Sequence, residues 1–144
     1  NPTIATPQCF IHAANANHIS LSIALALLRT EGGHPGTMKL NKNGSYDLGV
    51  MQVNDRTWIP KIANTYFNGD IHQAYITVRD NGCFNVMMGT QIFATYLKEA
   101  NGNYLTAIGY YNSHTPKYME RYQKTVMQKY LYVYNVFRNH HLVN

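Results

Sequence analysis

Apolar positions recur at helical spacing between Ser20 and Gly33, which predicts a single amphipathic helix. The residues on its apolar face are Ile23, Ala24, Leu27, Leu28 and Glu31. Ser20 can cap the start of this helix, and Gly32 with Gly33 supplies a left-handed stop at its end. Glu31 is therefore predicted to lie in the last turn, on the side that faces the core.

The rest of the chain is also mostly helical in pattern. Further predicted helices cover residues 9–16, 54–62, a short stretch within 66–82, 83–101, 104–111 and 117–137. The helix over 54–62 is predicted to have Asn54 or Asp55 as its cap and an interruption at Pro60. Residues 34–47 are polar and rich in asparagine and glycine, which predicts a loop or a small irregular β region. We therefore predict an all-α-dominated fold with one small non-helical insert, formed by residues 1–144 as a single compact domain.

Composition narrows the classes of partner. Twelve Lys and Arg against seven Asp and Glu give a formal charge of +5, which favours nucleic acid, an anionic membrane surface or an acidic cell-wall polymer. The basic residues are scattered, so we expect no nucleic-acid partner. No apolar run approaches the ~20 residues that a membrane span needs. The chain begins at Asn1 without a methionine, so we expect a processed or trimmed chain, for which removal of a secretion signal is one explanation.

Cys9 and Cys83 are the only cysteines, and their spacing matches no redox or zinc motif. They are either two buried thiols or one disulfide. A bridge would close a long loop, add roughly 4 kcal/mol of stability in the chain-entropy model and indicate an oxidising compartment.

The sequence lacks the motifs that are typical of most kinds of catalytic site. The seven histidines include no pair at the spacing of a zinc hydrolase, so we expect no metal site. No serine lies in a G-x-S-x-G elbow, and no phosphate-binding glycine loop occurs. We therefore expect no cofactor, and carboxylate chemistry remains.

Glu31 is the candidate acid. The negative end of the helix dipole and partial burial would both raise its pKa, which keeps a carboxylic acid protonated near neutral pH. Glycoside cleavage ordinarily needs a second carboxylate, for which Asp47 or Asp55 is the candidate. When the substrate supplies its own nucleophile, one carboxylate suffices. The alternative is a glutamate that merely lies on the surface at a helix end.

Three motifs in order resemble the lysozyme-like lytic transglycosylases. These motifs are Glu31 at a helix end, the run SYDLGVMQVN over 45–54, and Tyr111-Asn112 after an alanine-containing helix. The family pattern is Glu-Ser, then Gly-Leu-Met-Gln, then Ala-Tyr-Asn-Ala-Gly. The sequence NGSYD over 43–47 is similar to that of small specialised members, which accompany conjugation, type III and type IV secretion, and pilus machines. Residues 83–85 also match the third helix of the family.

The chain departs from the family pattern at three places. Gly32 replaces the serine after the glutamate, and Val50 replaces a leucine. Ser113-His114 replaces Ala-Gly after Tyr-Asn, so the surface that faces the sugar is expected to differ there.

The resemblance implies that Glu31 is a single catalytic acid and then base. It would protonate the oxygen between N-acetylmuramic acid and N-acetylglucosamine, and then remove the C6 hydroxyl proton to close a 1,6-anhydro ring. Gln52 would hydrogen-bond an N-acetyl group or sugar, and Met51 would pack under the glutamate or belong to the core. Tyr111 would place its hydroxyl near the carboxyl, and Asn112 would fix the turn.

The resemblance has further implications. Ser45 corresponds to a serine of the family's active site, and a Cys9–Cys83 bridge fits a periplasmic substrate. The expected partners are peptidoglycan strands and a subunit of a secretion, conjugation or pilus machine, for which the enzyme would open the wall locally. We expect a monomer. Two alternatives stay open: a hydrolytic muramidase of the same fold with Asp47 or Asp55 as second carboxylate, and a peptidoglycan-binding module without activity.

Overall fold

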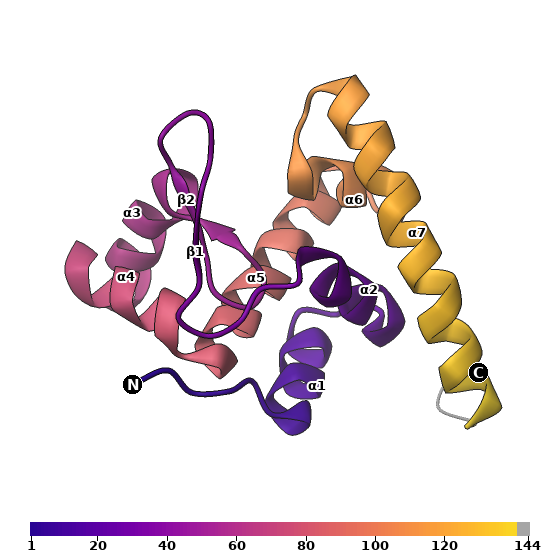
Figure 1. Ribbon diagram of the computed structural model, residues 1–144, viewed down its shortest axis with the longest axis horizontal. Coiled ribbons are helices and arrows are strands. Elements are labelled where there is room, and N and C mark those ends of the chain that lie inside the picture. Colours follow the sequence, from indigo (N-terminus) through magenta and orange to yellow (C-terminus); the bar gives the residue numbers. More distant parts are fainter. Residues whose placement is uncertain (141–144) are drawn as a thin grey trace. The chain divides into compact units, whose positions relative to one another are not determined.

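The computed structural model describes residues 1–140, which form seven α-helices and one three-stranded sheet (Figure 1). In chain order the elements are α1 (Pro7–Ala16), α2 (Leu21–Glu31), β1 (Met38–Leu40), β2 (Tyr46–Leu48), β3 (Val53–Asn54), α3 (Asp55–Tyr66), α4 (Ile71–Asp80), α5 (Gly82–Glu99), α6 (Tyr104–Asn112) and α7 (Pro116–Asn139). The predicted fold class, mostly helical with one small β insert, is confirmed. Residues 141–144 lie outside the described residues.

The chain divides into two compact units, and each is described by itself. The first unit holds Asn1–Ala13 and Glu31–Gly89, and the second holds Ala14–Thr30 and the chain from Thr90 onward. The sheet, α3 and α4 belong to the first unit, where α3 packs against both α4 and the sheet. The second unit contains α6 and α7, which pack side by side (Figure 1). Helices α1, α2 and α5 each contribute residues to both units.

Polar residues fix where the helices begin. Each of these side chains accepts a hydrogen bond from a backbone N–H in the first turn, which would otherwise lack a partner. The cap and donor pairs are Ser20–Ile23, Asn54–Thr57, Asp70–Gln73 and Asn103–Thr106, at 3.0–3.4 Å. The predicted cap at Ser20 is thereby confirmed, and of the two candidates for the cap of α3 the structure selects Asn54.

The predicted interruption at Pro60 is wrong, because α3 continues through it. A proline inside a helix removes one backbone hydrogen bond and crowds the carbonyl four residues earlier. In α3 the flanking residues Ile59, Ile62 and Ala63 are buried, and their packing outweighs the loss. Pro60 itself is exposed.

The polar insert after α2 is a β-hairpin extended by a third strand. Strand β1 pairs antiparallel with β2, and β2 pairs antiparallel with β3. The turn between β1 and β2 is closed by a hydrogen bond from the Asn41 N–H to the Ser45 carbonyl at 2.8 Å, and Gly44 provides a φ of +87°. The expected irregular β region is thus a short, regular sheet.

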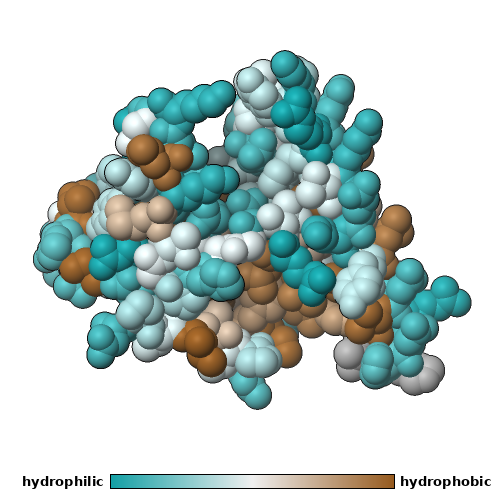
Figure 2. All heavy atoms as spheres, in the orientation of Figure 1, coloured by the Kyte–Doolittle hydropathy of each residue, from teal (hydrophilic) through white to brown (hydrophobic). Residues whose placement is uncertain are grey.

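Buried side chains are predominantly apolar. In the first unit they include Leu48, Met51, Val53, Ile59, Ile62, Val78 and Val86, and in the second Ile23, Leu27, Phe93, Ile108, Val126 and Val133. The face seen in Figure 2 is mostly hydrophilic, with apolar residues in small groups. Among residues 1–140, no helix has the length and apolar character needed to traverse a bilayer.

A disulfide joins Cys9 on α1 to Cys83 on α5, with 5.6 Å between their Cα atoms. The two cysteines are 74 residues apart in sequence, and both belong to the first unit. The alternative of two free thiols is therefore excluded. The bridge ties the N-terminal helix to the start of α5 and closes a loop that includes the sheet, α3 and α4.

Candidate active site

Glu31 is the last residue of α2 and is half-buried. Gly32 follows with a φ of +64°, the left-handed conformation that ends helices, so the predicted stop is confirmed. The helix presents the carboxyl of Glu31 at its C-terminal end, where the backbone carbonyls carry partial negative charge.

Gly33 holds the segment after Glu31 against the turn formed by residues 49–52. A Cβ atom at Gly33 would overlap the carbonyl oxygen of Gly49 and lie 2.9 Å from the Gln52 Nε2. Only glycine therefore fits. This close approach lies within the first unit. It brings Gly33, two residues after Glu31, into contact with the backbone of residues 49–52, which we call the GVMQ motif.

Gln52 ends that turn in an uncommon conformation. Its φ of +55° lies in the left-handed region, which costs energy for a residue with a side chain. Both its backbone N–H and its side-chain Nε2 donate to the Gly49 carbonyl, at 3.2 and 2.9 Å. The amide is thus folded back over its own turn, and its orientation is fixed.

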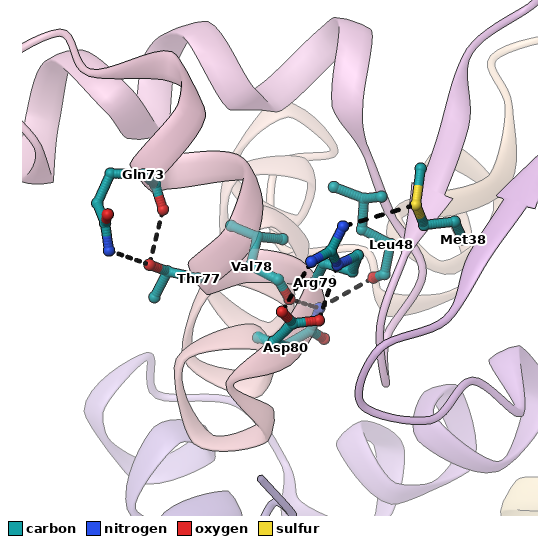
Figure 3. A network of polar contacts seen from close by, with 8 residues as sticks. Met38, Leu48, Gln73, Thr77, Val78, Arg79 and Asp80 are labelled. Carbon is teal, nitrogen blue, oxygen red and sulfur yellow. Dashed lines mark hydrogen bonds and ion pairs between the residues drawn. The ribbon is translucent and has the colours of Figure 1, made fainter. Parts of the chain in front are cut away.

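A buried amide supports the same turn from below. The Asn85 Oδ1 accepts from the Met51 N–H at 2.8 Å, and its Nδ2 donates to the Leu48 and Val78 carbonyls at 2.9 and 2.8 Å. Leu48 and Val78 are drawn in Figure 3. Asn85 has no exposed surface, so these bonds form away from water. Through this one side chain α5 fixes both ends of the stretch 48–51 and joins it to α4.

A second polar cluster, formed by Arg79 and Asp80, lies at the end of α4 (Figure 3). Arg79 donates to both carboxylate oxygens of Asp80, from Nε at 2.7 Å and Nη2 at 2.9 Å. These hydrogen bonds lower the pKa of Asp80 and raise that of Arg79, although burial opposes both shifts. The carbonyls of the same two residues accept from the Gly36 and Thr3 N–H groups. The cluster therefore anchors the loop between α2 and β1.

Met51 is fully buried. Its side chain covers Gly89 on α5, where a Cβ would lie 2.5 Å from the Met51 sulfur and 2.8 Å from its Cβ. This burial favours the core alternative over a contact with sugar.

Ser45 is the last residue of the hairpin turn between β1 and β2 and is also buried. Its hydroxyl donates to the Asn43 Oδ1 at 2.6 Å and accepts from the Asn41 and Asn54 side-chain amides at 3.2 and 2.9 Å. The Asn54 amide also donates to the Asp47 Oδ1 at 3.0 Å. The hydroxyl of Ser45 thus organises the turn that precedes the GVMQ motif.

The two candidates for a second carboxylate differ in how they are used. Asp55 accepts with both oxygens, from the Tyr46 N–H at 2.9 Å and from the Tyr75 hydroxyl at 3.0 Å. Burial, followed by this hydrogen bond, raises the pKa of Tyr75 to about 12. Asp55 therefore links β2 to α4. The carboxylate of Asp47, on β2, accepts a hydrogen bond only from the Asn54 side chain among the described residues.

Tyr111 and Asn112 belong to the second unit and end α6. The Tyr111 ring is half-buried and lies 6.4 Å from the rings of Phe93 and of Tyr96 on α5. Asn112 is exposed at the last position of the helix. The Tyr111 ring of the Tyr-Asn motif (Tyr111-Asn112) thus packs against aromatic side chains of α5.

The family model of the Transglycosylase SLT domain matches residues 8–135. The chain belongs to this family. Its members are peptidoglycan lytic transglycosylases, lyases that cleave glycan strands outside the cytoplasm, so the resemblance and the lysozyme-like fold are confirmed. No curated protein matches the chain.

This SLT domain carries an aromatic and ionic cluster that the sequence analysis did not single out. His114 Nε2 donates to the Glu99 Oε2 at 2.7 Å, and its ring stacks on Tyr110 with centroids 4.1 Å apart and planes 17° apart. Tyr96 meets both rings edge-on, and burial, with a contribution from Glu99, raises the pKa of its hydroxyl. Tyr110 lies in the last turn of α6 and His114 two residues beyond its end, so the four-residue spacing of these two rings is the signal that could have revealed this stack.

Metal binding finds no geometric support in residues 1–140, where no three His, Cys, Asp or Glu side chains gather into a possible ligand set. The cluster of Glu99 and His114 offers only two such groups.

Proposed function

We propose that this SLT domain cleaves the bond between N-acetylmuramic acid and N-acetylglucosamine with Glu31 as its single catalytic residue. The Glu31 carboxyl protonates the glycosidic oxygen as the bond from C1 breaks, and N-acetylglucosamine leaves with a hydroxyl at C4. The carboxylate then takes the proton of the C6 hydroxyl as O6 bonds to C1. The product is a 1,6-anhydromuramic end, formed without water.

The observation that supports this proposal most is the close approach at Gly33. It fixes the end of α2 against the turn that carries Gln52, so an acid and an amide share one rigid framework. No described residue donates a hydrogen bond to the Gln52 Oε1. That oxygen is suited to accept the N–H of an acetamido group.

The remaining site residues have supporting parts in this proposal. Tyr111 and Asn112, at the end of α6, are proposed to contact the glycan. Ser45 acts through the hairpin turn that it organises, and Met51 through the packing beneath the GVMQ motif. Neither residue needs to touch the sugar for its substitution to lower activity.

Hydrolysis by the same fold is the alternative. It requires a second carboxylate that activates water, and Asp55 already has both oxygens engaged by Tyr46 and Tyr75. Asp47 is the remaining candidate, with one oxygen bonded to Asn54. If Asp47→Asn reduces turnover to the level of Glu31→Gln, hydrolysis is favoured, whereas a loss below about tenfold supports the single-carboxylate mechanism.

We further propose a periplasmic location, where the enzyme opens the wall for a secretion, conjugation or pilus machine. The NGSYD run of the hairpin, which is similar to that of specialised members, and the Cys9–Cys83 bridge support this role. The positive net charge would also assist approach to an anionic sacculus.

Mass spectrometry of the soluble products from purified peptidoglycan tests the reaction. We expect 1,6-anhydro ends from the native chain and none from Glu31→Gln, whose thermal stability stays unchanged or rises because a strained acid has been removed. Reducing ends, heavier by one water, would establish hydrolysis. A folded native chain that binds peptidoglycan without releasing products would establish a binding module.

A further inference from the structure

The rings of Tyr110 and His114 form a flat, partly exposed platform in the second unit. The side chain of His114 keeps 51% of its surface exposed, and that of Glu99 keeps 47%. Stacking at 4.1 Å and the 2.7 Å bond to Glu99 hold the imidazole in one orientation. The platform is therefore preorganised, although much of it faces solvent.

Polar atoms at the edge of this platform lack partners among the described residues. These atoms are the Tyr110 hydroxyl, the second oxygen of Glu99 and the His114 Nδ1. When the imidazole is neutral and its Nε2–H donates to Glu99, Nδ1 is an acceptor. The edge thus offers one hydroxyl, which donates or accepts, and two acceptors around an apolar ring face.

We propose that Glu99, Tyr110 and His114 form a further saccharide subsite that binds an N-acetylated sugar of the glycan strand, an assignment that rests on the proposed function. A pyranose ring has a flat face of C–H groups and a rim of hydroxyl and acetamido groups, which matches an aromatic face bordered by polar atoms. The hydroxyls of the sugar would donate to Glu99 and to the His114 Nδ1.

Continuity with Tyr111 favours the glycan strand as the occupant. Tyr96 lies close to the rings of Tyr110 and His114 and also to the Tyr111 ring, at centroid distances of 5.6–6.4 Å. The proposed subsite therefore extends the surface of the Tyr-Asn motif. A strand bound at Tyr111 would reach the platform with a neighbouring sugar.

The platform is a feature of this chain rather than of the family pattern. Where that pattern has Ala-Gly, this chain has Ser113-His114. Neither alanine nor glycine supplies a ring to stack on Tyr110 or a nitrogen to bond Glu99. The subsite would therefore change which sugars or strand ends this SLT domain prefers.

Titration of the Glu31→Gln chain with a soluble N-acetylglucosamine oligomer, followed by NMR, tests the subsite because the probe is bound without being cleaved. We expect the ring signals of His114 and Tyr110 to shift, and His114→Ala to weaken the Kd about five- to tenfold. Tyr110→Phe keeps the stack and loses only the hydroxyl, so a loss of about two- to threefold is expected. The matched control is Tyr118→Ala, an exposed tyrosine of α7, which should leave the Kd unchanged.

The outcomes separate this proposal from the proposed function. If the native chain releases anhydro products while His114→Ala leaves the Kd unchanged, the subsite is wrong and the catalytic assignment stands. The subsite is equally overturned if His114→Ala lowers kcat at constant Kd, because the cluster then only positions the loop after α6. If no products form but the Kd still depends on His114, the subsite is supported and catalysis by Glu31 fails.

Discussion

At the scale of single residues, buried polar side chains fix the backbone around the proposed catalytic acid. Asn85 and Ser45 are both nearly or fully inaccessible to solvent, and each makes three side-chain hydrogen bonds. A buried amide or hydroxyl is costly unless all its partners are present, so these residues tolerate only one arrangement of the neighbouring loops. They specify geometry more than they add net stability.

Asn85→Ala should lower the free energy of unfolding by about 3 kcal/mol, because it leaves the Met51 N–H and the Leu48 and Val78 carbonyls unpaired in the interior. Urea denaturation followed by circular dichroism measures this change. Asn64→Ala, at an exposed position of α3, is the control and should change stability by less than about 0.5 kcal/mol. Equal effects of the two substitutions would show that the buried amide has no special role.

Tyr75 should give the fold a dependence on alkaline pH. Its pKa is raised from 10.0 to about 12, so the neutral hydroxyl contributes its stability in full below pH 10 and loses it as the pH rises toward 12. Tyr75→Phe should cost about 1 kcal/mol at pH 7, since the Asp55 Oδ2 then loses its donor. Unfolding free energies measured from pH 7 to pH 11 should converge for the two proteins, and a constant difference would refute the assignment.

At the scale of elements, the contact between the end of α2 and the 49–52 turn sets the position of Glu31. Two adjacent glycines serve it for different reasons. Gly32 needs its left-handed φ but has open space around it, whereas Gly33 has no such φ and lies directly against Gly49. The first glycine ends the helix, and the second allows the close approach.

Gly33→Ala should reduce peptidoglycan cleavage by at least about tenfold, because the added methyl group pushes Glu31 away from the turn. Gly32→Ala is the matched comparison: it should cost about 1 kcal/mol of stability through backbone strain and leave most activity intact. Initial rates of cleavage and thermal unfolding of both variants test this. A greater loss of activity in Gly32→Ala would contradict the proposed contact.

Local signals in the sequence predict most of the elements but few of the contacts between them. The caps at Ser20 and Asn54 and the stop at Gly32 are read from the sequence because each acts on its own helix. The interruption predicted at Pro60 is wrong, because burial of the neighbouring side chains stabilises the helix more than the proline destabilises it. Asn85 forms hydrogen bonds with Met51 and Leu48, which are 34 and 37 positions away in the sequence. The periodicity of apolar residues does not predict contacts over such separations.

The candidate site likewise contains residues that the sequence reveals and contacts that only the structure reveals. Glu31 and Gln52 are found through motif order, whereas the stack of Tyr110 and His114 depends on how α6 ends. The positions of the tyrosine and the histidine in the sequence do not show that their rings stack. Nor do they show the bond between His114 and Glu99, which lies 15 residues earlier on α5.

At the scale of the whole molecule, one covalent link supplements the hydrophobic core. The Cys9–Cys83 bridge spans 74 residues, and a loop of that length restricts the unfolded chain strongly. It closes around the sheet, α3 and α4, so the framework of the GVMQ motif lies within the loop.

Replacing both cysteines by alanine should lower the free energy of unfolding by about 4 kcal/mol in the chain-entropy model. Urea denaturation of the native protein with and without a reducing agent provides the comparison. The reduced native protein and the double variant should unfold at similar urea concentrations. If reduction leaves the unfolding midpoint of the native protein unchanged, the bridge does not contribute to stability.

The same bridge bears on the lifetime of the enzyme. A chain whose thiols are kept reduced spends a larger fraction of time unfolded, and proteases remove unfolded chains continuously. Oxidation of the two thiols would lengthen that lifetime without altering any of the residues proposed to bind the glycan. SLT domains act outside the cytoplasm, where thiols are more readily oxidised. Copies of the enzyme whose disulfide has not yet formed would thus be short-lived. Copies would become long-lived only in the oxidising environment outside the cytoplasm, where peptidoglycan lies.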